Sequence, residues 1–101
     1  MSITKTQLKS GKTKVTFKIE SDVAANFAKA SLVGDFNNWD ESADSMKKLK
    51  KDGSFTIQKT FEAGEYQFKY LLGSKNWLNE PEADKVATTE YSDSQNSVIV
   101  L

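Results

Sequence analysis

Neither cysteine nor histidine occurs among the 101 residues of this chain. The absence of cysteine excludes disulfide bonds and thiolate metal sites. The absence of histidine removes the commonest general base, the commonest metal ligand and the serine–histidine arrangement of nucleophilic catalysis. We therefore expect no cofactor, no bound metal ion and no enzymatic activity.

Long apolar runs and an excess of one charge are also missing. No segment approaches the roughly 20 apolar residues that cross a bilayer, and residues 1–11 lack the hydrophobic core of a signal peptide. Lysine plus arginine and aspartate plus glutamate number 14 each, so the formal net charge is zero. No field attracts nucleic acid or an anionic membrane, and neither is expected as a partner. These features favour a soluble, cytoplasmic protein.

Alternating apolar and polar residues predict strands that each bury one face. The pattern covers residues 13–20, 28–33, 54–61 and 65–72, and residues 97–101 close the chain as a last strand. Asp52-Gly53 is a strong two-residue turn signal, so the strand after it belongs to a hairpin. About seven short strands, mainly antiparallel and separated by turn signals, predict an all-β protein folded as a β-sandwich.

The length of the chain allows one domain with a single core. We place this domain at residues 13–101, after a polar lead-in at residues 1–12 that is ordered in part at most. Residues 21–26 could form a helical turn, but a plain connection between strands is preferred because the segment is too short to be helical alone. The lysines at positions 47, 48, 50 and 51 could suggest a phosphate site. A solvated edge strand is favoured instead, since lysines protect exposed edges.

Turn-forming residues follow the strand at residues 28–33 and place two aromatic side chains in a loop. Gly34, Asp35, Asn37 and Asn38 favour turns and flank these rings, which belong to Phe36 and Trp39. Phe36 is expected to plug the end of the sandwich. Trp39 could do the same, or it could serve as an exposed contact plate.

A second tryptophan, Trp77, follows the turn at residues 73–75, and Lys69 lies on the outward face of the preceding strand. This combination is typical of a binding surface. The C–H face of a pyranose stacks on an indole, and Lys69, Gln67 and Asn96 could hydrogen-bond to the sugar hydroxyls.

The acidic residues offer two other kinds of site. A carboxylate pair for glycoside hydrolysis could come from Asp35, Asp40, Glu41, Glu80, Glu82 and Asp84. A calcium site could use Asp35, Asn37, Asn38 and Asp40, although the closing bidentate glutamate of an EF-hand loop is missing. Acidic residues in turns are more often turn formers and caps, so neither site is preferred.

Four motifs in order resemble the family 48 carbohydrate-binding module, which includes the isoamylase N-terminal, or early set, domain and the glycogen-binding domain of AMP-activated protein kinase β subunits. They are VGDFNNW at residues 33–39, DGSF at 52–55, GEYQFKYL at 64–71 and NSVIV at 96–100. The segment WLNEPEAD at residues 77–84 most resembles small free-standing bacterial early-set proteins. The resemblance covers about residues 14–101 and implies an immunoglobulin-like β-sandwich.

The resemblance also implies roles for particular residues. Trp39 and Trp77 would be the stacking plates for glycogen or another α-1,4-glucan, a starch-type polysaccharide or oligosaccharide. Lys69 and Asn96 would be polar contacts. The kinase modules insert a leucine through the sugar ring from the loop before the last strand, and Tyr91 is the nearest candidate to replace it. Alternatively, an early-set module could dock a glucan-metabolising enzyme and bind no sugar.

Overall fold

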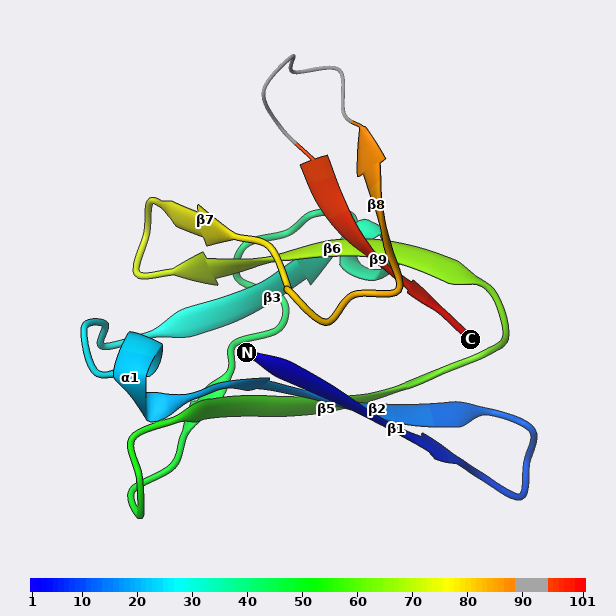
Figure 1. Cartoon of the computed structure of the whole chain (residues 1–101), viewed down its shortest axis with the longest axis horizontal. Coiled ribbons are helices and arrows are strands. Elements are labelled where there is room, and N and C mark those ends of the chain that lie inside the picture. The colour runs from blue at the N-terminus through cyan, green and yellow to red at the C-terminus, as the bar shows by residue number, and fades with distance from the viewer. Residues whose placement is uncertain (89–94) are drawn as a thin grey trace.

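Two antiparallel β-sheets pack face to face in the computed structural model, which describes residues 1–88 and 95–101 (Figure 1). The first sheet has, in order across it, β1 (Ser2–Gln7), β2 (Thr13–Ile19), β5 (Phe55–Phe61) and β4 (Lys47–Lys48). The second has β3 (Ala30–Gly34), β6 (Glu65–Leu72), β9 (Gln95–Val100) and β8 (Lys85–Thr88), and β7 (Asn76–Leu78) also pairs with β6. The all-β, immunoglobulin-like sandwich is confirmed, with nine strands in the described part of the chain.

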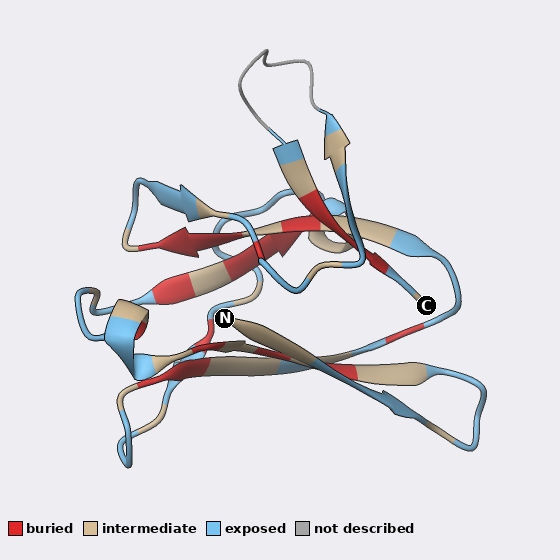
Figure 2. Ribbon diagram, in the orientation of Figure 1, coloured by how far each residue is buried: buried red, intermediate tan, exposed pale blue. Residues whose placement is uncertain are grey.

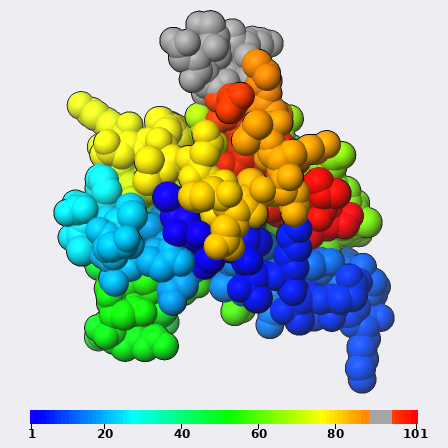
Figure 3. Space-filling model, in the orientation of Figure 1, coloured from blue at the N-terminus to red at the C-terminus, as the bar shows by residue number. Residues whose placement is uncertain are grey.

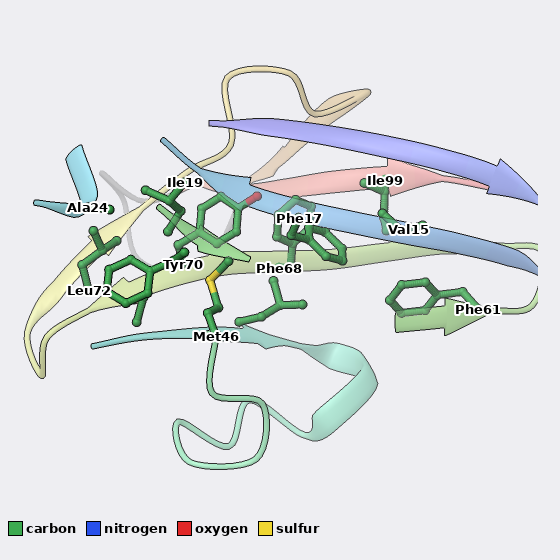
Figure 4. Close-up of a cluster of buried hydrophobic side chains, with 13 residues drawn as sticks. Val15, Phe17, Ile19, Ala24, Met46, Phe61, Phe68, Tyr70, Leu72 and Ile99 are labelled. Atoms are coloured by element: carbon green, nitrogen blue, oxygen red, sulfur yellow. The ribbon is translucent and has the colours of Figure 1, made fainter. Parts of the chain in front are cut away.

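The core lies between the two sheets because each strand turns alternate side chains inward. Phe17 of β2 meets Phe68 of β6 edge to face, with ring centroids 5.2 Å apart, and Tyr70 and Met46 pack nearby (Figure 4). Buried residues accordingly run along the strands of both layers (Figure 2). Fully burying one such apolar side chain stabilises the fold by roughly 1.5–3 kcal/mol.

Helical structure is confined to two short segments among the described residues, α1 (Ser21–Ala24) and the 3-10 turn η1 (Asp35–Asn37). The first is a single helical turn within residues 21–26, where a plain connection was preferred. Within residues 1–88 and 95–101 there is no helix with the length and apolar character needed to cross a membrane.

Residues 2–7, which belong to the expected lead-in, form β1 at the edge of the first sheet. This strand pairs with β2 along its whole length, from Ser2 opposite Lys18 to Gln7 opposite Thr13. Its order comes from main-chain hydrogen bonds, which need no apolar pattern in the sequence. Ile3 packs against the core, and Lys5 donates from Nζ to Asp84 Oδ2 at 2.6 Å. In Figure 3 the segment that follows β7 (yellow to orange) lies against this dark-blue N-terminal strand.

Other strands differ from expectation in smaller ways. The lysine-rich segment does form an edge strand, since β4 pairs with β5 at the end of the first sheet. β8 was not predicted, because residues 85–88 lack an apolar face. It pairs with β9, with Val86 opposite Ser97. Trp77 lies within β7 and not in a loop after the turn, because β7 folds back on β6.

The end of β3 requires a glycine. Gly34 lies opposite Phe68 of β6, and its backbone is extended, with φ of −167°, so the requirement is steric. A Cβ atom at this position would lie 2.6 Å from Cε2 of Phe36 and closer still to the backbone oxygen of Gln67. The close approach lets Phe36 fold back over the strand and pack on Phe61, with centroids 5.2 Å apart.

We predict that Gly34→Ala destabilises the fold by about 3 kcal/mol, the upper part of the range for overpacked sites, because the oxygen of Gln67 belongs to a central strand and cannot move away. Urea unfolding followed by tryptophan fluorescence measures this. Gly11→Ala is the control, since its Cβ would meet nothing within 4 Å while φ is +88°. The Gly11→Ala substitution should lower the free energy of unfolding by only about 1 kcal/mol, through backbone strain. Equal stability of Gly34→Ala and wild type would contradict the steric requirement.

Candidate functional site

The outward side of the second sheet, which we call the outer face, carries most of the predicted site residues. Phe68, Tyr70 and Leu72 of β6 point into the core, so the alternate residues of the strand point outward. Cross-strand partners share a face: Val33 of β3 lies opposite Lys69, and Trp77 of β7 lies opposite Leu71. Trp77 and Lys69 are therefore on the same face.

Both tryptophans are accessible to a ligand. The exposed fraction is 38% for Trp39 and 41% for Trp77, so neither ring is a core plug. Trp39 is held by a hydrogen bond from its backbone N–H to the oxygen of Gly34 at 2.8 Å. Its φ of +57° is in the left-handed region, which costs a residue with a Cβ about 1–2 kcal/mol. Phe36, by contrast, is partly buried and packs against the core, as predicted.

The polar site residues Lys69 and Gln67 of β6 lie on the same face of the second sheet as Trp77. Asn96 Nδ2 donates to Gln67 Oε1 at 3.0 Å, so the structure brings these two side chains together. Asn96 lies within β9 and not before it. Because Ser97 pairs with Phe68, the continuing register sets Asn96 beside Lys69. Tyr91, the candidate to replace the family's leucine, lies outside the described residues.

A polar clamp that sequence analysis missed closes the loop that carries Trp39. Asn37 Nδ2 donates to the backbone oxygen of Leu32 at 3.0 Å and to Asp44 Oδ2 at 2.7 Å. Lys59 of β5 reaches Asp44 Oδ1 from the opposite sheet at 2.8 Å. Burial alone would raise the pKa of Asp44, but the hydrogen bonds from Lys59 and Asn37 outweigh it and hold that pKa below its usual value. The loop is thus fixed to both sheets.

The clamp has a signal in the sequence that was overlooked. Every second residue of β5 points inward, as Phe55, Ile57 and Phe61 do. Lys59 is at one of these inward positions, opposite the buried Val15. A lysine in an apolar series needs a partner. The identity of that partner, Asp44, depends on the fold and not on local spacing.

A second network fixes the segment after Trp77. Tyr70 donates its hydroxyl to Glu80 Oε1 at 2.7 Å, and the backbone N–H of Glu80 donates to Ser97 Oγ at 2.8 Å. Ser97 Oγ donates in turn to Asn79 Oδ1 at 3.0 Å. Glu80 is 3% exposed. Its pKa is raised, because burial outweighs the hydrogen bonds from Glu82 N–H and Tyr70. β7 is therefore tied at its end to β6 and β9.

Several of the side chains considered for acidic sites are engaged in separate hydrogen bonds. Asp35 Oδ2 accepts from Gln67 N–H, and Asp40 Oδ1 accepts from Ser42. Asn37 and Glu80 belong to the two networks above. Across the described residues, no three histidine, cysteine, aspartate or glutamate side chains converge in a way that could hold a metal ion.

Comparison with known proteins adds no identity to this geometry. No family model matches the chain, and no curated protein is significantly similar to it. The site is therefore interpreted from its own chemistry: two accessible indoles, polar side chains on the face that carries Trp77, and a hydrogen-bonded network that ties down each tryptophan-bearing segment.

We predict that Asp44→Asn destabilises the protein at neutral pH by about 1–2 kcal/mol, because Lys59 loses a charged hydrogen-bond acceptor. Since folding lowers the pKa of Asp44, its contribution is present above the unfolded pKa of about 4 and is lost as the pH falls through the folded value. Urea unfolding of wild type and variant from pH 7 to pH 2 should show the difference shrinking in acid. A difference of the same size at every pH would contradict the role of the charge.

Glu80→Gln should have the opposite pH dependence. Folding raises the pKa of Glu80, so its favourable contribution is present below the unfolded pKa and is lost as the pH rises through the folded value. The stability of Glu80→Gln relative to wild type should therefore improve as the pH rises from about 4, the unfolded pKa of a glutamate, through the higher folded value. The same unfolding series measures it, with the exposed Glu62→Gln as the matched control. A relative stability that falls over this range would show that the buried carboxylate is favoured in its ionised form.

Proposed function

We propose that this chain is a non-catalytic, cytoplasmic module that binds glycogen or another α-1,4-glucan on the outer face of the second sheet. The observation that carries the proposal is the pair of accessible indoles, 38% and 41% exposed, of which Trp77 shares its face with Lys69, Gln67 and Asn96. The resemblance to family 48 modules supports the same ligand class.

The chemistry of this surface suits a neutral polyhydroxyl ligand. An indole offers a flat, electron-rich face to the C–H groups of a sugar ring. The amide groups of Gln67 and Asn96, already joined to each other, retain donor and acceptor capacity for hydroxyls. Open platforms of this kind bind in the micromolar to millimolar range, about −4 to −8 kcal/mol.

The tryptophan platform predicts a specific loss of affinity. Trp39→Ala and Trp77→Ala should each weaken binding of β-cyclodextrin about 30-fold, the effect of losing a contact worth ~2 kcal/mol. Isothermal titration calorimetry measures the affinity, and gel electrophoresis with and without glycogen checks it on the polymer. Val86→Ala, an exposed apolar substitution on β8, is the control and should leave affinity unchanged. Unaltered binding by both tryptophan variants would refute the platform.

A protein-docking role is the second candidate. It is favoured by one observation, the 54% exposure of Val86 on β8, the edge strand of the second sheet. In that case the module would contact a glucan-metabolising enzyme through the surface around this side chain. The Val86→Ala control separates the two roles, because it should weaken a complex with such an enzyme and leave sugar binding intact.

A further inference from the structure

A small open pocket lies on the outer face, across β6 from Trp77. Its volume is about 280 Å³. The pocket is lined by three segments: β3 with the residue before it, the 41–45 loop, and the end of β6 with the turn that follows. The lining residues include Lys29, Ser31, Glu41, Ser45, Leu71 and Ser74. None of these residues belongs to the platform described above.

The sheet register connects the pocket to the platform. Leu71 lies opposite Trp77 on one side and opposite Ser31 on the other. Trp77 and the pocket wall at Ser31 are therefore separated only by β6, about two strand spacings of ~5 Å each. Beyond β3 the sheet edge is taken by the 41–45 loop, since Ser45 bridges to Ser31 and the oxygen of Asp44 accepts from Leu32 N–H. A chain that runs from Trp77 over Leu71 meets this loop as a wall.

The lining combines a buried floor with unused polar groups. Leu71, 3% exposed, forms part of that floor. The hydroxyl of Ser42 is taken by Asp40, but Lys29 and Glu41 form no ion pair with any described residue. One ammonium and one carboxylate give the lining no net charge, which favours a neutral ligand over an anion. A carboxylate accepts from adjacent hydroxyls, and an ammonium group donates to them.

The size of the pocket limits the ligand to about one ring. Pockets for drug-sized ligands begin near 300 Å³, and this one is slightly smaller. We propose that it is an end subsite, which holds the terminal sugar unit of a linear glucan whose next units lie over Leu71 and Trp77. Glu41 and Lys29 bind the hydroxyls of the terminal unit, and the 41–45 loop stops the chain. This inference rests on the proposed function and adds to it a preference for chain ends.

The test compares a glucan that has ends with one that has none. Calorimetric titrations with maltoheptaose, which is linear, and with β-cyclodextrin, a closed ring, are made on wild type, Lys29→Met, Glu41→Gln and Trp77→Ala. The two pocket variants should weaken maltoheptaose binding about tenfold each, as expected for a hydrogen bond to a charged group, and leave β-cyclodextrin binding unchanged. Trp77→Ala should weaken both.

Matched controls are Lys50→Met and Glu62→Gln, exposed charges that do not line the pocket, and both should bind as wild type does. Because Lys29 and Glu41 are exposed, their variants should fold, and thermal unfolding verifies it. The end subsite is overturned if the wild type binds both sugars and the pocket variants keep full affinity for maltoheptaose. It is also overturned if the pocket variants lose affinity for both sugars equally. In either case the tryptophan platform is unaffected. If the wild type binds neither sugar, the proposed function and the end subsite both fall.

Discussion

The register of β6 against β3 is the constraint on which the rest of the structure depends. It sends Phe68, Tyr70 and Leu72 into the core and leaves Lys69 on the outer face, opposite Val33. A slip of one residue would exchange the two faces and bury the lysine. Gly34 helps to fix the pairing, because only a residue without a side chain fits between the oxygen of Gln67 and the ring of Phe36.

Alternation in the sequence was enough to locate the strands that bury one face, because burial of alternate side chains is what creates the pattern. β2, β5 and β6 are examples, and β6 begins and ends where residues 65–72 predict. β1 and β8 escaped prediction because their order comes from main-chain pairing with β2 and β9. Such pairing makes no demand on side-chain type, so polar edge strands leave little trace in one sequence.

For the candidate site, the sequence pointed to Trp39 and Trp77 because large aromatics beside turns are unusual. It could not show what holds them. Lys59 and Asp44 are 15 residues apart, and Tyr70 and Glu80 come from different segments. Each pair forms only once the sheets have packed. Glu80 was among the acidic residues expected to be turn formers or caps, yet its carboxyl group accepts a hydrogen bond from the hydroxyl of Tyr70 in a buried position.

Two lysines on the inward side of the first sheet show how the sandwich is closed. Lys5 and Lys59 both lie opposite Val15, and each reaches an aspartate on a segment attached to the second sheet, Asp84 or Asp44. The hydrogen bond from Lys5 lowers the pKa of Asp84, as Lys59 does for Asp44 despite its burial. These pairs tie the two layers together where apolar packing ends.

The outer face differs from the wet face of an ordinary antiparallel sheet. Val33, Leu71 and Val98 lie on it and are nevertheless 0%, 3% and 3% exposed. The second sheet therefore packs apolar side chains on both sides, and its outer polar groups stand on a close-packed layer. Such a surface loses little conformational freedom when a ligand binds, which reduces the entropic cost of association. A rigid platform also explains why strained backbone at Trp39 persists: the clamp through Asn37, Asp44 and Lys59 fixes the loop more strongly than the strain opposes it.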